Sequence, residues 1–141
     1  MRFMIIVKAT PESEADQMPS AETMDAMGRF NDELIKAGVM LTGEGLRSTR
    51  YGSMIQYKGG AFTVTDGPFA ESKEAIAGFW IVDVKDKAEA LEWVKRIPFE
   101  EGETIELRKV FEASDWASEG IDPDLIEREQ AQRAENEKRP S

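Results

Sequence analysis

The sequence predicts an α+β fold of the ferredoxin-like kind, in which an antiparallel sheet carries two helices on one face. Short apolar runs typical of strands and two helical segments follow in the order strand, helix, strand, hairpin, strand, helix, strand. The chain has 141 residues, which is enough for one domain and too few for two ordinary ones. We therefore expect one ferredoxin-like domain at residues 1–110 and an acidic, helix-prone tail at 111–141.

The first strand and helix have clear signals. Residues 3–7 are apolar on both alternating faces and rich in branched side chains, which predicts a buried central strand. Ser20 is a good N-cap for the helix that follows, and Gly38 is placed to end it. Its apolar residues recur at spacings of three and four and predict one stripe facing the sheet: Met24, Met27, Phe30 and Leu34.

The middle of the chain predicts short strands in quick succession. The first covers residues 39–46, and two more begin at Ser53 and Ala61. The pair Gly59-Gly60 separates the last two runs, and a Gly-Gly pair between alternating runs predicts a β-hairpin.

The second half predicts another strand, helix and strand. Residues 78–84 are apolar on both faces, which indicates a second central strand. Asp86 followed by Glu89 predicts the start of a helix that ends at Pro98, and residues 104–110 form the last strand. The helix is expected to turn inward Leu91, Val94 and Ile97.

The strand at 78–84 also predicts an association. If the two helices cover one face of the sheet and Trp80 and Val82 lie on the other, that second face is a large apolar patch. Packing sheet against sheet with a second subunit is the simplest cover, so we expect a homodimer.

Composition excludes several classes of function. A net charge of −10 repels phosphate backbones and anionic lipid, so we expect no nucleic-acid partner and no membrane partner. The absence of cysteine and histidine excludes thiolate sites, imidazole-ligated metals and His-dependent catalysis. No metal and no cofactor is expected. The first apolar run is too short for a signal peptide or a membrane span, and the expected location is cytoplasmic.

The segment TDGPFAESKE at residues 65–74 contains the first candidate site. Pro68 fixes its own φ and favours an extended Gly67, while the Asp66 carboxylate is placed to accept backbone N–H bonds two or three residues on. One interpretation is purely architectural. The other is that Asp66 is a catalytic carboxylate at the mouth of a cleft, with Gly67, Pro68 and Phe69 lining the ligand.

Three further residues are candidates, each with a structural alternative. Glu44 lies between two glycines, which favours a carboxylate aimed at a ligand, although such loops are common. Lys73 is a candidate for holding an anionic group, or one charge on a solvated helical turn. Trp80 is a candidate for stacking on a planar ligand, or a packing residue of the core or interface.

Four motifs in order resemble the YCII-related family, specifically the branch named for its Asp-Gly-Pro-Phe (DGPF) motif. They are AGVMLTGEGL, TDGPFAESKE, AIAGFWIVDV and EALEWVKRIP, and the resemblance covers about residues 1–110. It implies a ferredoxin-like domain that pairs into a dimeric α/β barrel, with a cleft lined by the DGPF loop. Relatives have been proposed to use a His–Asp pair, which a chain without histidine cannot supply.

Three functions follow as hypotheses. The first is binding of a small metabolite, anionic ligands included, near the DGPF loop, with lyase, hydrolase or isomerase chemistry by Asp66 and Glu44; whether the protein is an enzyme stays open. The second is a non-catalytic regulatory partner, for example in a sigma-factor-linked system of the kind encoded beside members of this branch. The third is a ligand sensor without turnover.

The tail has two interpretations. A helix that starts at Asp122-Pro123 is either a marginal surface helix that frays after Arg133 or an arm that docks on the dimer mate. The arm would dock through Trp116, Ile121, Leu125 and Ile126.

Overall fold

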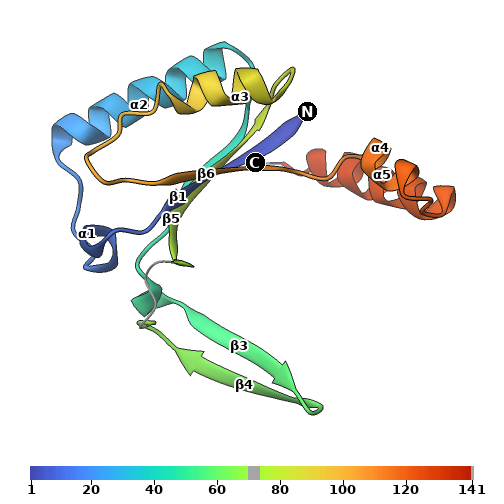
Figure 1. Ribbon diagram of the computed structural model, residues 1–141, viewed down its shortest axis with the longest axis horizontal. Helices are drawn as coiled ribbons and strands as arrows, with labels where there is room; N and C mark the ends of the chain where they lie inside the picture. Colours follow the sequence, from blue (N-terminus) through green and yellow to red (C-terminus); the bar gives the residue numbers. More distant parts are fainter. Residues whose placement is uncertain (70–73, 141) are drawn as a thin grey trace.

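A computed structural model describes residues 1–69 and 74–140, and its main body has two layers (Figure 1). A four-stranded antiparallel sheet has the order β2-β5-β1-β6, and helices α2 and α3 lie across one of its faces. This strand order, with a helix before β2 and before β6, is the ferredoxin-like arrangement that the sequence predicts. The four strands are β1 (Arg2–Lys8), β2 (Met40–Gly45), β5 (Ile76–Asp83) and β6 (Ile105–Lys109).

Strand β1 is central, as predicted, because it pairs with β5 on one side and β6 on the other. Ile5 lies opposite Trp80 and Phe3 opposite Val82, so these four side chains share the face beneath the helices. Together with residues of α2 they form the main apolar core, in which Ile5 and Val82 are completely buried.

Helix α2 (Ala21–Lys36) begins after the predicted N-cap Ser20, whose side chain accepts a hydrogen bond from the Thr23 N–H. It ends before Gly38, which has a left-handed φ of 72°. Phe30 and Leu34 of the predicted stripe are buried, and Met27 packs against them. Met24 is 53% exposed, so the stripe begins at Met27, one turn later than predicted.

Helix α3 (Lys87–Val94) begins at the predicted cap Asp86, whose carboxylate accepts the Glu89 N–H at 2.9 Å. Ala90 and Ile97 are buried against the sheet, whereas Leu91 is 41% exposed. Val94 and Ile97 pack on the core as predicted, and the prediction is wrong only for Leu91, whose inward place Ala90 takes. A small residue at this point lets the helix backbone approach the sheet.

The prediction for the two faces of β5 is wrong. Trp80 and Val82 lie under the helices, where the Trp80 indole N–H donates to Asn31 Oδ1 at 2.8 Å and the ring meets Phe30 edge-on. The face away from the helices carries Phe79 and Ile81 instead. Both faces of β5 are apolar, so the alternation of residues alone does not distinguish them.

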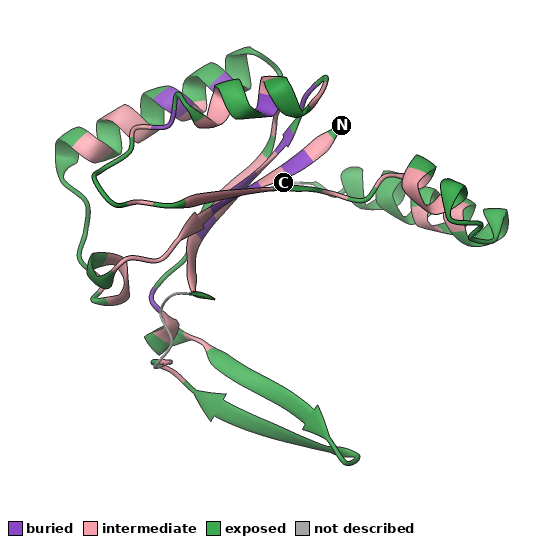
Figure 2. Ribbon diagram, viewed as in Figure 1, coloured by how far each residue is buried: buried purple, intermediate pink, exposed green. Residues whose placement is uncertain are grey.

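The predicted hairpin forms a separate two-stranded sheet, here called the ribbon, made of β3 (Ser53–Lys58) and β4 (Ala61–Asp66). Gly59 and Gly60 both have left-handed φ values, 61° and 79°, as a two-residue hairpin turn requires. The ribbon projects away from the four-stranded sheet, and all of its residues are exposed (Figures 1 and 2).

Short elements connect the ribbon to the rest of the chain, and a helical tail follows β6. A one-turn helix α1 (Pro11–Glu14) comes after β1, and a 3₁₀ turn η1 (Thr49–Tyr51) precedes the ribbon. The tail folds as α4 (Ala113–Ser118) and α5 (Pro123–Glu137). Asp122 caps α5 as predicted, but the helix continues past Arg133, where an ion pair with Glu129 supports it. In the described part of the chain, no helix combines the length and apolar character needed to cross a membrane.

Candidate functional site at the root of the ribbon

The Asp-Gly-Pro segment lies where the ribbon joins the main body. Asp66 is the last residue of β4, is exposed, and accepts a 2.7 Å hydrogen bond from the Ser53 hydroxyl on the opposite strand. The predicted Asx-type cap is wrong, because Pro68 has no N–H and the Phe69 N–H donates to Thr49 Oγ1 at 3.1 Å. Asp66 therefore closes the two strands at their root instead of capping the turn.

Gly67 is where the segment passes closest to η1. Its N–H donates to the Gly52 carbonyl at 2.9 Å, which adds one more rung to the ribbon. A Cβ atom at Gly67 would overlap the Thr49 carbonyl oxygen and come within 2.6 Å of its carbon. Glycine is thus required for space, and the following peptide bond to Pro68 is cis. Gly67, Pro68 and Phe69 hold the ribbon against η1.

Two carboxylates fix η1 from the other side. Glu14 accepts hydrogen bonds from the Thr49 N–H at 3.1 Å and the Thr49 hydroxyl at 2.6 Å. Asp16 does the same for Ser48, at 3.2 Å from its N–H and 2.7 Å from its hydroxyl. We call these four residues the carboxylate clasp. Each carboxylate takes both donors of one residue, so the clasp ties α1 to the root of the ribbon with four hydrogen bonds.

The surroundings of Asp16 in the clasp lower the pKa of its carboxyl group. The hydrogen bond from the Ser48 hydroxyl lowers the pKa of Asp16, partial burial opposes this, and Arg47 and Arg50 add a smaller lowering effect. Asp16 also has a left-handed φ of 56°, a conformation that Asp tolerates better than most residues. Both features favour a fixed, ionised carboxylate with a structural role.

Sequence reasoning missed the clasp because its two halves are more than 30 residues apart. The sequence contains one indication of the clasp, the pair Ser48-Thr49 at the start of a short helical turn, because both residue types often cap helices. The sequence does not reveal which distant acids bind them.

The other predicted site residues are dispersed. Glu44 is exposed on β2, where it lies opposite Phe79, on the side of the sheet away from the helices. Trp80 lies in the core, with its N–H satisfied by Asn31. Lys73 lies outside the described residues. The structure therefore groups Asp66 with Gly67, Pro68 and Phe69, leaves Glu44 on the sheet, and gives Trp80 a packing role.

The uncovered side of the sheet has an organised pattern that sequence reasoning did not find. We call it the open face. Register places Met4 opposite Ile81 and Ile6 opposite Phe79, which gives an apolar floor across β1 and β5. Glu44 lies on the β2 side of this floor.

Charged residues border the floor on the β6 side. Lys8 Nζ lies 3.0 Å from Glu106 Oε1, and Arg108 pairs with the same carboxylate. The hydrogen bond from Lys8, followed by that from Arg108, lowers the pKa of Glu106. Two cations and one carboxylate leave a net charge of +1 on this border, in a chain whose net charge is −10. The open face thus offers an apolar surface, a cationic side and a separate carboxylate.

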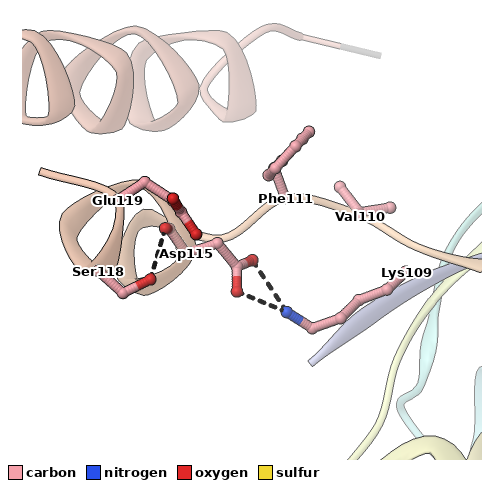
Figure 3. Close-up of a pocket in the computed structure, with 6 residues that line it drawn as sticks. All are labelled: Lys109, Val110, Phe111, Asp115, Ser118 and Glu119. Carbon is pink, nitrogen blue, oxygen red and sulfur yellow. Dashed lines mark hydrogen bonds and ion pairs between the residues drawn. The ribbon is translucent and has the colours of Figure 1, made fainter. Parts of the chain in front are cut away.

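Two surface hollows lie near the tail rather than near the predicted site residues. The first has a volume of about 300 Å³ and is lined by residues that join β6 to α4 (Figure 3). Both oxygens of Asp115 accept from Lys109, at 3.0 and 2.9 Å, and Glu119 adds a second acid. Lys109 is the main cause of the lowered pKa of Asp115. The second hollow, about 260 Å³, lies between α5 and the sheet end near Arg2. Because Asp115 neutralises Lys109, the first hollow is a poorer site for an anion than the open face.

Comparison with known proteins identifies the family. A profile of the YCII-related domain matches residues 1–114, so the chain belongs to the YCII-related family. No curated protein matches the chain. Among solved structures, the chain is similar to 5-chloro-2-hydroxyhydroquinone dehydrochlorinase from Burkholderia phenoliruptrix AC1100, solved as a complex with 2,5-dihydroxybenzoquinone. The TM-score is 0.44 at 16% identity, and the match covers 79% of this chain and 94% of the other.

Proposed function

We propose that this protein, as a member of the DGPF branch of the YCII-related family, binds a small anionic metabolite on the open face of its sheet, in a cleft that a second copy closes. One observation carries the proposal: an apolar floor has a net positive border on one side and an exposed carboxylate, Glu44, on the other. Few surfaces of an acidic chain combine these three features.

Each part of the open face has a separate task in this proposal. The floor, through the half-buried Met4, Phe79 and Ile81, takes the apolar body of the ligand and excludes water from it. Lys8 and Arg108 together carry two positive charges, and Glu106 neutralises one of them. The remaining positive charge attracts the carboxylate or phenolate of the ligand. Lys73, the anion holder expected from the sequence, lies outside the described residues and stays a candidate for the same task.

Two carboxylates, Glu44 and Asp66, would transfer protons in the proposed site. Glu44 would remove or return a proton on the bound molecule, with Asp66 as the second acid or base. Proton transfer of this kind supports isomerase and lyase reactions, and it needs no histidine. If binding occurs without turnover, the protein is a ligand sensor that uses the same face.

The test is a thermal-shift screen with benzoate, 4-hydroxybenzoate and succinate as probes. We expect a probe that raises the Tm of the wild type and of the control Glu101→Gln, an exposed acid in the turn after α3. The same probe should shift the double variant Lys8→Gln, Arg108→Gln much less. A probe that stabilises this double variant as strongly as the wild type would contradict binding at the cationic border.

Catalysis is tested separately from binding. With succinate bound, the one probe of the three with C–H protons next to a carboxylate, Glu44→Gln should keep the thermal shift and lose any exchange of those protons with deuterated solvent, observed by NMR. Exchange that persists at the wild-type rate in Glu44→Gln and in Asp66→Asn would exclude both carboxylates as the base.

A further inference from the structure

We propose that the ribbon is an arm that packs one of its faces on the open face of a second copy of the chain, so that Asp66 acts in the cleft of the partner. The ribbon, β3 and β4, contributes no side chain to the apolar core that the described residues form. This inference deepens the proposed function by naming what covers the open face, and it rests on that function only for the role given to Asp66.

The two faces of the ribbon differ in chemistry. Residues directly opposite each other share a face, so Ile55 lies with Val64 and Tyr57 with Phe62. These four side chains form the apolar face of the ribbon, and they are 64, 62, 66 and 73% exposed, respectively. The other face carries Gln56 opposite Thr63, Lys58 opposite Ala61 and Met54 opposite Thr65. Met54, 59% exposed, is its one large apolar side chain, so this face is mainly polar. One side of the ribbon is suited to water and the other to a protein surface.

The apolar face lacks a cover within the described part of the chain. Tyr57 and Phe62 contact each other, with ring centroids 5.1 Å apart, but both remain largely exposed. A two-stranded ribbon alone in water is marginally stable at best, and a contiguous apolar patch of this kind marks an interaction surface. The ribbon therefore requires a partner.

Charge favours a second copy of this chain as that partner. Two molecules of net charge −10 repel each other, so copies associate most easily where charge is absent. Between Ser53 and Asp66 the ribbon carries one charged residue, Lys58, at its tip and on its polar face. The four apolar residues of this face are thus uncharged, and Asp66 lies beyond them at the root of the ribbon, in a chain of which 33% of the residues are charged.

The chain also supplies the complementary surface. The open face carries the half-buried Met4, Phe79 and Ile81 around Ile6, which is 8% exposed, and no helix of the described part of the chain lies over this face (Figure 1). A two-fold dimer places the ribbon of each copy on the open face of the other, which satisfies both apolar surfaces with one symmetric arrangement.

The areas involved fit a stable dimer. Four side chains exposed by about two thirds offer on the order of 400 Å² on each ribbon, given the size of apolar and aromatic side chains. Two ribbons and the two surfaces that they cover then bury about 1,600 Å², the size of a standard stable interface.

The same geometry assigns a place to Asp66. Asp66 and Ser53 form the last opposed pair on the apolar face of the ribbon, two residues beyond Val64. A docked ribbon therefore turns Asp66 toward the sheet of the second copy, the surface that carries Glu44. The carboxylate clasp and the close approach of Gly67 to Thr49 fix the direction in which the ribbon leaves its own chain. The motif carboxylate would complete a site that a single chain leaves unfinished.

The first experiment compares two adjacent substitutions on opposite faces of the ribbon, Phe62→Asp and Thr63→Asp. Both positions are exposed in the single chain, so neither change should unfold it. We expect wild type and Thr63→Asp to run as dimers of the 15.8 kDa chain in analytical ultracentrifugation. Phe62→Asp should raise the dimer dissociation constant by about 100-fold or more, because it buries an unpaired charge. A monomeric wild type, or equal association of the two variants, would overturn the proposal.

The second experiment asks which surface receives the ribbon. Ile81→Asp on the open face should also give a monomer, with circular dichroism confirming that it is folded. When this variant is mixed with Phe62→Asp, one of the two ribbon-to-sheet contacts is intact in the mixed pair, so we expect heterodimers. If ribbons packed on ribbons, every mixed pair would contain the charged Phe62→Asp ribbon and mixing would rescue nothing. That outcome overturns the proposed arrangement.

The results also separate this inference from the proposed function. If association depends on Phe62 but no probe binds, the arm stands and the ligand proposal fails. If a probe binds at Lys8 and Arg108 while Phe62→Asp remains dimeric, the ligand site stands and the arm fails.

Discussion

The two sheets of this molecule use the same kind of residue in opposite ways. In the four-stranded sheet Val82 is completely buried, whereas in the ribbon Val64 is 62% exposed. Both valines lie in antiparallel strands with apolar neighbours across the pair. The difference is the cover: α2 and α3 supply it for the main sheet, whereas none of the described residues covers the ribbon (Figure 2). An apolar strand pattern therefore specifies a strand without specifying which surface buries it.

The largest expected effect comes from two phenylalanines that differ in this cover. Phe30→Ala removes a ring that is 3% exposed and packs on Trp80, and it should lower the free energy of unfolding by about 3 to 5 kcal/mol. Phe62→Ala removes a ring that is 73% exposed and should change it by less than about 0.5 kcal/mol. Urea titration at chain concentrations too low for association measures both. Equal losses would mean that the ribbon is buried within its own chain.

An intermediate effect is expected at the joint between the two sheets. Gly67→Ala places a Cβ against the Thr49 carbonyl group and should cost about 1 to 3 kcal/mol, because backbone must move. Gly45→Ala is the control, since nothing lies within 4 Å of a Cβ there. Urea titration, together with hydrogen exchange of the Phe69 and Gly67 amides, checks the prediction. Unchanged exchange and stability in Gly67→Ala would show that the joint is loose rather than closely packed.

The smallest effect concerns the charge of the carboxylate clasp. The pKa of Asp16 is lower in the folded chain than in the unfolded one, so its stabilising contribution is complete at neutral pH. The contribution starts to decrease as the pH falls below about 4, the pKa of Asp in an unfolded chain. It is lost once the pH has fallen through the lower pKa that Asp16 has in the folded chain. Asp16→Asn keeps a residue that tolerates the left-handed backbone but removes the charge, so its stability should fall less steeply between about pH 5 and 3.

Urea titrations of wild type and Asp16→Asn across that pH range give the comparison. Exchange of the Ser48 amide proton reports the clasp directly, because that N–H donates to Asp16. Identical pH profiles for the two proteins would indicate that Asp16 contributes no charge-dependent stability.

Local signals in the sequence determined the elements of this fold. Ser20, Asp86 and Asp122 cap the helices that they were predicted to begin, and Gly59-Gly60 forms the predicted hairpin turn. These signals act within a few residues, through one hydrogen bond or one backbone angle, so the sequence shows them directly. The order of strands and helices then leaves few arrangements besides the ferredoxin-like one.

Only the tertiary structure decided which face of each element is covered and which distant residues meet. Strand β5 is apolar on both faces, so period-two alternation does not show that Trp80 lies inside and Phe79 outside. The binding of Ser48 by Asp16, and the net positive border made by Lys8 and Arg108 around Glu106, depend on chain segments brought together by folding. Such contacts arise from packing across long separations in sequence, and no pattern along a single segment contains them.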